Sequence, residues 1–206
     1  MIQNEPNTAI FKAKEEGKEQ NGDKEHFRVY QQANPDSRGD ILNVYFTDVI
    51  EDPFNYRDLV QGLRTCSDLD IFNFYLACYG GNVQAGTQII NAIRESPAKE
   101  INMIVDACCY SMAADLALQG TSLRLNPGTF LMFHNYSGGK GGKGGELLVG
   151  IVNDARTNAT STYVWDYPFL SKPEIKGLLR DQDVYVHWND PDLGDRLKRH
   201  FKGRKK

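Results

Sequence analysis

Apolar residues recur along this chain in short β-branched and aromatic runs, separated by stretches with helical spacing. The runs that predict strands are ILNVYFTDVI (41–50), DIFNFYLAC (70–78), INMIVDACC (101–109) and TFLMFHNY (129–136). The stretches that predict helices are 53–66, 82–96, 111–120 and a longer one from Glu146 to about Leu170. Strands that alternate with helices are typical of an α/β fold with a largely parallel sheet.

Composition predicts one globular domain between two polar ends. Of the 206 residues, 40% are hydrophobic and 25% are charged, which suits a single buried core. We expect a flexible polar arm at 1–25, the folded domain at 26–198 and a solvated basic tail, RHFKGRKK, at 199–206. The net charge of −3 predicts no general attraction to nucleic acid or to membranes.

Neither an export signal nor a membrane span is indicated. The first 25 residues contain no apolar signal-peptide core, and nowhere do about 18 apolar residues follow one another. These features predict a cytoplasmic protein. No motif predicts a cofactor, and SGGKGGKGG (137–145) lacks the Walker spacing and is better interpreted as a hinge or flap.

The four cysteines lie at 66, 78, 108 and 109, with no C-x-x-C spacing that would indicate zinc. We expect them to be reduced and mostly buried. A thiolate at Cys109 is an alternative nucleophile, but a strand residue two places before the turn should point into the core.

Ser111 has two interpretations in the stretch VDACCYSMAAD (105–115). It lies where a strand gives way to a helix, so it can be an ordinary helix N-cap. It can also be a nucleophile beside the unpaired N–H groups of a helix start, which would stabilise an oxyanion. Gly80 and Gly81 at the preceding strand-to-helix turn, and His134 at a later strand end, favour the nucleophile.

Three ordered motifs resemble the ClpP family, the proteolytic subunit of the Clp protease. They are YLACYGGNVQAGTQIINAI, CCYSMAADLALQG and RLNPGTFLMFHNYSGG, within a resemblance that covers roughly residues 41 to 195. The resemblance implies a ClpP/crotonase-like spiral of β-β-α units with a protruding handle helix. It also implies homo-oligomeric rings, a heptamer or a double-ring tetradecamer, that degrade protein or peptide substrates, with a possible AAA+ unfoldase partner.

By the same resemblance, Ser111 is the nucleophile, His134 the general base, and the N–H groups of Gly81 and Met112 the oxyanion hole. The third triad member is Asp183, with Asp181 as its competitor, because DVYV at 183–186 reproduces the family's order of an Asp before a short apolar stretch. The Asp would hold the imidazole in the correct tautomer.

Several residues depart from the family pattern. Cys78 and Tyr79 replace the usual Ser-Pro before the glycine pair, and Asp115 occupies a normally apolar position one helical turn after Ser111. The glycine-rich segment after His134 also replaces the family's handle strand. These departures suit a divergent or phage-encoded relative that matures capsid or scaffold proteins.

The resemblance therefore predicts a serine endopeptidase that works through an acyl-enzyme. Two alternatives stay open at this point. One is a catalytically silent ClpP-like scaffold subunit, and the other is a crotonase-like acyl-CoA enzyme, which shares the spiral fold.

Overall fold

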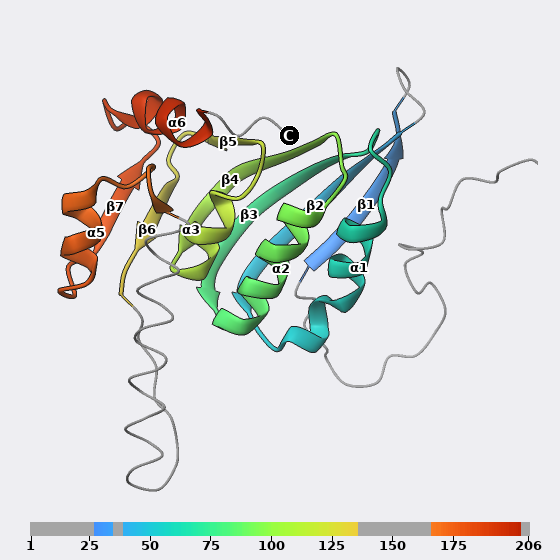
Figure 1. Ribbon diagram of the computed structural model, residues 1–206, viewed down its shortest axis with the longest axis horizontal. Coiled ribbons are helices and arrows are strands. Elements are labelled where there is room, and N and C mark those ends of the chain that lie inside the picture. The colour runs from blue at the N-terminus through green and yellow to red at the C-terminus, as the bar shows by residue number, and fades with distance from the viewer. Residues whose placement is uncertain (1–26, 35–38, 136–165, 203–206) are drawn as a thin grey trace, which may run out of the picture.

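The computed structural model describes residues 27–34, 39–135 and 166–202. In chain order, its elements are β1 (Phe27–Ala33), β2 (Asp40–Ile50), the 3₁₀ helix η1 (Pro53–Tyr56), α1 (Arg57–Thr65), β3 (Ile71–Gly81), α2 (Val83–Glu95), β4 (Glu100–Tyr110), α3 (Met112–Ala117), β5 (Ser122–Leu125), β6 (Phe130–Phe133), α5 (Lys172–Leu178), β7 (Val184–His187) and α6 (Leu193–Phe201). Figure 1 shows them as one sheet with helices along it.

The sheet has seven strands, in the order β1-β2-β3-β4-β6-β7, with β5 paired to β4 beside this path. Strands β2, β3, β4 and β6 run parallel to their neighbours in this series, and β5 is also parallel to β4. Among the strands that the structure describes, the outer ones, β1 and β7, are antiparallel to their neighbours. The expected α/β fold with a largely parallel sheet is confirmed.

One face of the sheet is apolar because the strands alternate. In β3, Phe72, Phe74, Leu76 and Cys78 are fully buried, and the residues between them are half-buried or exposed. Helices α1, α2 and α3 cover this face (Figure 1). The core therefore lies between the sheet and these three helices, and α3 brings its start to the carboxyl end of β4.

The opposite face carries polar side chains that pair across the strands. Asn73 donates to Asn43 over 3.0 Å, and Asn102 donates to Asn73 over 3.1 Å. Beside this ladder, the rings of Tyr45 and Tyr75 stack with their centroids 4.8 Å apart. Half-buried asparagines, a half-buried Tyr75 and an exposed Tyr45 suit a sheet face that the helices of the described chain leave uncovered.

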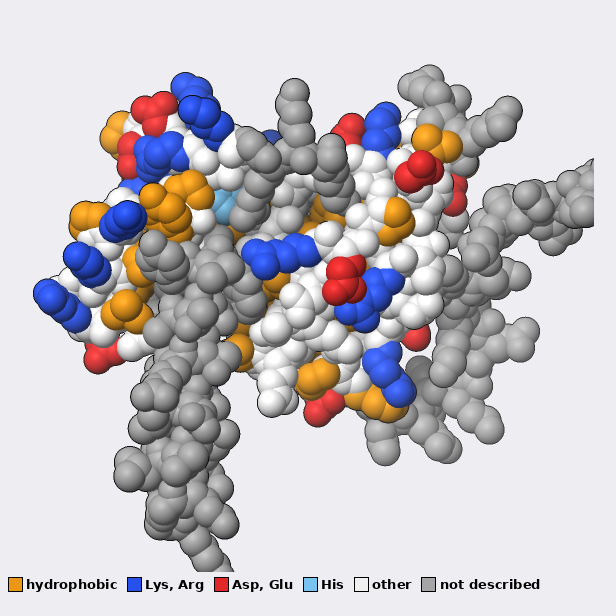
Figure 2. All heavy atoms as spheres, viewed as in Figure 1, with side chains coloured by type: hydrophobic (Ala, Val, Ile, Leu, Met, Phe, Trp, Pro, Cys, Tyr) orange, Lys and Arg blue, Asp and Glu red, His pale blue; other side chains and the backbone are white. Residues whose placement is uncertain are grey.

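The C-terminal elements form a separate edge of the fold, where α5 and α6 flank β7 (Figure 1). Ser171 begins α5 with a capping box, in which Glu174 and Ser171 bond reciprocally to backbone N–H groups. Arg196 of α6 forms a forked pair with both carboxylate oxygens of Glu174, at 3.0 and 2.8 Å. On this side of Figure 2, orange hydrophobic side chains lie among blue Lys and Arg.

The basic tail begins later than the sequence indicated. Residues 199–201, assigned to the tail, form the last turn of α6, and His200 is only 2% exposed. Its ring Nε2 lies 2.7 Å from the carbonyl oxygen of Leu118, and the ring packs edge-on against Phe169. The expectation that His200 lies in a poorly structured end is wrong, because these contacts attach α6 to the core.

The predicted strands and helices at 41–120 are confirmed within a few residues. The fourth strand is shorter than predicted, because β6 ends at Phe133 and His134 already lies beyond it. Most of the predicted helix from Glu146 to Leu170, including the handle, lies outside the described residues. Strands β1 and β5 were not predicted, since β1 mixes polar and apolar residues and β5 has only four.

The ion pair between Glu174 and Arg196 should stabilise the fold at neutral pH and lose this effect in acid. Burial raises the pKa of Glu174, but hydrogen bonds from Arg196 and Ser171 outweigh it and lower the pKa to about 2. Since the folded-state pKa is lowered, the stabilisation is present above the ordinary value of 4.5 and is lost as pH falls toward 2. Glu174→Gln should reduce the free energy of unfolding at pH 7 by about 1–3 kcal/mol, measured by urea denaturation.

A matched control is Glu95→Gln, which breaks the more exposed pair that Glu95 forms with Arg64. It should cost less than about 1 kcal/mol. Equal losses in the two variants, or a Glu174→Gln loss that persists at pH 2, would contradict this account.

Candidate active site

Ser111 lies in a strained turn between β4 and α3. Its backbone has φ 55° and ψ −129°, a region that residues with a side chain rarely occupy, and its side chain makes no capping hydrogen bond to α3. Its N–H donates to the carbonyl oxygen of Met132 over 2.8 Å. The interpretation of Ser111 as an ordinary N-cap is therefore wrong, and its hydroxyl is not used to satisfy the helix start.

The glycine pair after β3 packs directly against this turn. A Cβ on Gly80 would lie 2.5 Å from the carbonyl oxygen of Tyr110, 2.8 Å from Ser111 Cβ and 3.2 Å from the Met112 nitrogen. Gly80 and Gly81 have φ of 82° and 137°, values that favour glycine. The structure thus brings the Gly80–Gly81 turn next to the start of α3.

Met112 is held in place from the side of α2. Its side chain is 4% exposed, and a Cβ on Gly86 would lie 2.2 Å from Met112 Cγ, so Gly86 leaves the room that Met112 fills. Asn82 caps α2 by accepting from the N–H groups of Gln84 and Ala85, at 2.9 and 3.0 Å. Two helix starts, those of α2 and α3, are therefore fixed side by side.

His134 follows β6, the parallel neighbour of β4 at this end of the sheet. Tyr110 pairs with Met132 in this register, so Ser111 and His134 lie just past the ends of adjacent strands. The side chain of His134 is half-buried. The strand pairing therefore brings the two predicted residues to the same edge of the sheet.

Asp183 directly precedes the antiparallel strand β7. Phe133 pairs with Val184, so the positions that follow in the same register are His134 and Asp183. Asp181 is placed differently, because it has φ 61° and its Oδ1 accepts a hydrogen bond from Asn135 Nδ2 over 3.0 Å. The register thus puts Asp183, rather than Asp181, opposite the histidine.

The side chains of Ser111, His134 and Asp183 are not joined by hydrogen bonds in the described part of the chain. Asp183 is exposed to solvent, and Ser111 and His134 are half-buried. The backbone brings the three residues together at one edge of the sheet, without the closed hydrogen-bond chain of an assembled triad. Catalytic hydrogen bonds are often long in unliganded sites and shorten when a substrate binds.

The thiols near the turn are poor nucleophiles. Cys78 and Cys109 pair across β3 and β4, and both are fully buried. Burial raises the pKa of Cys78 to about 11 and raises the pKa of Cys109 well above its ordinary value. All four cysteines are free, and the thiolate alternative at Cys109 is disfavoured, as expected.

A second acidic group that the sequence did not single out lies behind Ser111. Asp166 is 1% exposed, and Asp115 lies on α3, one helical turn after Ser111. Burial raises the pKa of Asp115 to about 6 against the lowering effect of the Asp166 hydrogen bond. Burial raises the pKa of Asp166 further, and the charge of Asp115 and the hydrogen bond to it add to the rise.

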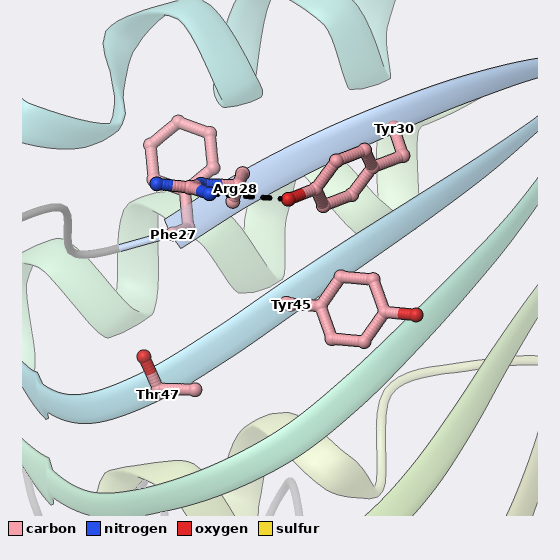
Figure 3. Close-up of a pocket in the computed structure, with 5 residues that line it drawn as sticks. All are labelled: Phe27, Arg28, Tyr30, Tyr45 and Thr47. Carbon is pink, nitrogen blue, oxygen red and sulfur yellow. Dashed lines mark hydrogen bonds between the residues drawn. The ribbon is translucent and has the colours of Figure 1, made fainter.

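A groove of about 540 Å³ lies elsewhere, on β1 and β2. Figure 3 shows its lining residues, Phe27, Arg28, Tyr30, Tyr45 and Thr47, with the Arg28 guanidinium 3.2 Å from the Tyr30 hydroxyl. It shares no residue with the turn at Ser111. The groove therefore does not bear on the chemistry of that turn.

The described residues were also compared with what a metal site and a membrane span require. Among the described residues, no three His, Cys, Asp or Glu side chains gather in a way that could hold a metal ion. In the same part of the chain, no helix is long and apolar enough to cross a membrane.

Fold and site together define an α/β protein with its candidate site at the carboxyl ends of parallel strands. The family model described as Clp protease matches residues 60–153, from α1 past Ser111 and His134. This match supports the resemblance to the ClpP family. No curated protein matches the chain. The match ends before Asp183, so the choice of Asp183 as a candidate depends on the strand register.

The close approach of Gly80 to Ser111 should be essential to the fold of the site. Gly80→Ala combines positive φ with contacts of 2.5 and 2.8 Å, so we expect a loss of about 2–5 kcal/mol in the free energy of unfolding. Gly128→Ala is the matched control, since Gly128 has φ 85° but no atom within 4 Å of its Cβ position.

The control should cost only about 1–2 kcal/mol, because it adds backbone strain alone. Urea denaturation of both variants measures the difference. Equal losses would mean that the turn has room beside Ser111, contrary to the structure.

Proposed function

We propose that this protein is a serine endopeptidase that cleaves peptide bonds through an acyl-enzyme at Ser111. The match to the Clp protease family model supports a peptidase, and the backbone of Ser111 is the observation that carries the assignment to this residue. A serine held at φ 55° without a capping bond presents its hydroxyl at the strand end instead of using it to start the helix.

In this proposal His134 takes the proton of the Ser111 hydroxyl as it attacks the substrate carbonyl, and later returns it to the leaving amine. Asp183 orients the imidazole and stabilises its charged form. The register of β6 and β7 supports this choice, because Phe133 pairs with Val184 and the next positions along the two strands are His134 and Asp183. The attack forms an oxyanion, which the N–H groups of Gly81 and Met112 would stabilise.

The packing around the N–H groups of Gly81 and Met112 supports their assignment to an oxyanion hole. Gly80 packs on Ser111 and Met112, so the next residue, Gly81, lies beside the start of α3. Glycine at both positions lets a substrate backbone approach closely, and an extended peptide could add to the sheet beside the turn.

Assembly into rings, a heptamer or a double-ring tetradecamer, is the second part of the proposal. The uncovered sheet face with its Asn43–Asn73–Asn102 ladder and stacked tyrosines offers a surface that neighbouring copies could cover. An AAA+ unfoldase partner and a cytoplasmic location are expectations that follow from the family alone. A capsid-maturation role is the subtype that the divergent segments favour.

One alternative has an observation in its favour. A catalytically silent scaffold subunit would explain why no hydrogen bond links Ser111 to His134 within the described residues. The crotonase-like alternative predicts no use for a strained serine, since that group activates an acyl thioester with paired N–H groups.

A fluorophosphonate probe separates these functions, because it reacts only with an activated serine. We expect one covalent adduct per chain, on Ser111, that is absent in Ser111→Ala and at least about 100-fold slower to form in His134→Ala. Intact-protein mass spectrometry measures the adduct, and release of a fluorophore from a short peptide tests endopeptidase activity. An assembled particle that shows no adduct would support the scaffold alternative.

The third triad member is tested by a matched pair of substitutions. Asp183→Asn should slow adduct formation by a factor on the order of 10³–10⁴, because the imidazole loses the carboxylate that fixes its tautomer. Asp181→Asn removes only the partner of Asn135 and should change the rate by less than about tenfold. The reverse ranking would assign the role to Asp181.

A further inference from the structure

Aromatic side chains form a continuous row across β3, β4, β6 and β7. We call this row the aromatic shelf, and its members are Tyr79, Tyr110, Phe130, Tyr185 and His187. The ring centroid of Tyr110 lies 5.6 Å from that of Tyr79 and 5.3 Å from that of Phe130. The ring centroid of Phe130 lies 6.1 Å from that of Tyr185 and 5.4 Å from that of His187. Four neighbouring strands therefore share one aromatic surface (Figure 1).

The aromatic shelf lies on the sheet face that points away from the core. Along β6, Leu131 and Phe133 belong to the buried core, whereas Phe130 and Met132 are half-buried. On the neighbouring strand β7, Tyr185 is 49% exposed. Successive side chains of a strand point to opposite faces, so the shelf occupies the face opposite the core. The described part of the chain leaves much of this surface open to solvent.

The candidate histidine and aspartate lie on the same face as the shelf. The alternation along β6, continued by one residue, carries His134 to the side of Phe130 and Met132. The alternation along β7 carries Asp183 to the side of Tyr185 in the same way. The strand register pairs Met132 with Tyr185. This pair lies two residues, or about 7 Å, from the positions of His134 and Asp183, so the shelf begins beside the candidate site.

The two tyrosines on β3 and β4 join the shelf to the nucleophile turn. Tyr110 directly precedes Ser111 and pairs with Met132 of β6. Tyr79 is 61% exposed and directly precedes Gly80, which packs on Ser111. The strand ends that position the serine therefore also present these two rings.

An extended peptide bound at Ser111 along these strands would place its side chains over the shelf. Side chains two and four residues from the scissile bond lie about 7 and 13 Å from it. The nearer distance reaches the pair of Met132 and Tyr185, and the farther one reaches Phe130 and His187. Aromatic rings favour tilted or edge-on contacts with other rings, and each such contact contributes a factor of about two to ten in affinity.

A second copy of the chain suits this surface less well than a substrate does. The asparagine ladder that we propose for assembly lies toward the other end of the strands, since Asn73 is six residues before Tyr79 on β3. A copy seated on the shelf would also cover the positions of His134 and Asp183 and keep a substrate away from Ser111. The position of the shelf beside the site therefore favours the substrate.

We propose that the aromatic shelf binds the substrate peptide and selects sequences that carry an aromatic side chain two to four residues from the scissile bond. The selection of a cleaved bond rests on the proposed function of Ser111. Binding of the peptide does not, and it is tested separately.

The first test measures peptide binding to Ser111→Ala, which keeps the shelf and forms no acyl-enzyme. Fluorescence polarisation gives the Kd of a labelled ten-residue peptide of Ala, Ser and Gln with one central Phe, and of the same peptide with Ala in place of Phe. The Phe peptide should bind at least about tenfold more tightly, because its ring contacts several rings of the shelf. Equal affinities, or no binding of either peptide, would overturn the proposal.

Substitutions within the shelf should remove this preference. In the Ser111→Ala background, the double variant Tyr79→Ala/Tyr185→Ala should reduce the ratio of the two Kd values below about threefold, and each single variant should reduce it at least about twofold. Tyr185→Phe should retain the ratio, because it keeps the ring. An unchanged ratio in the alanine variants would refute the shelf.

Tyr30→Ala is the matched control, because Tyr30 is 51% exposed and lies on β1, outside the shelf. It should keep the ratio of the two Kd values. An equal loss in Tyr30→Ala and in the double variant would contradict a local site. Native mass spectrometry should show the same oligomeric state in both, and loss of assembly in the double variant alone would assign the shelf to an interface between copies instead.

The second test follows the cleaved bond in the chain with Ser111 intact. The Phe is moved along the peptide one residue at a time, and mass spectrometry identifies the products. The cleaved bond should move with the Phe and stay two to four residues from it. In the double variant this dependence should be lost, while the rate of fluorophosphonate adduct formation stays within about threefold of the unaltered chain, since the small probe does not reach the shelf.

A cleaved bond that ignores the position of the Phe would refute the selection. A chain that forms no adduct contradicts the proposed function instead, and the binding test on Ser111→Ala still decides on the shelf.

Discussion

The rest of the candidate site depends on the contact between Gly80 and the backbone of Tyr110 and Ser111. Only a residue without a Cβ fits there, since any side chain would meet the Tyr110 carbonyl at 2.5 Å. This contact sets where β3 ends relative to β4, and with it where α2 and α3 begin. Gly86 then receives Met112, which fixes the second helix against the first. Small residues at these two points therefore position the serine.

Strand pairing positions the remaining residues. The β4–β6 register sets His134 beyond Ser111, and the β6–β7 register sets Asp183 opposite His134. Backbone pairing accounts for which residues are neighbours, but it does not make their side-chain hydrogen bonds. Those depend on side-chain torsions and on what binds beside the turn.

Much of this arrangement could be predicted from the sequence, because the strands from Ile41 to Cys109 are dense β-branched and aromatic runs followed by helical spacing. Glycines at a strand-to-helix turn likewise indicated the close approach. The strain at Ser111 could not be predicted, since a serine before a helix is also a common N-cap. Its φ is set by the Gly80 contact and the bond to Met132, both made by distant parts of the chain.

The end of the chain shows the same limit. RHFKGRKK is basic enough to indicate a solvated tail, yet His200 is buried because amphipathic spacing in α6 turns it toward Leu118 and Phe169. The sequence of a short basic segment does not predict which of its residues will be buried against the core. Strand β1 could not be predicted for a similar reason, because it forms by pairing with β2 and not from an apolar pattern of its own.

The acid pair sets a different constraint, because it costs free energy where an apolar pair would not. Burying Asp115 and Asp166 requires desolvation of both groups, and hydrophobic residues of similar size would pack there at least as stably. Asp115 lies one helical turn after Ser111, so this cost falls on the helix that begins at the candidate nucleophile.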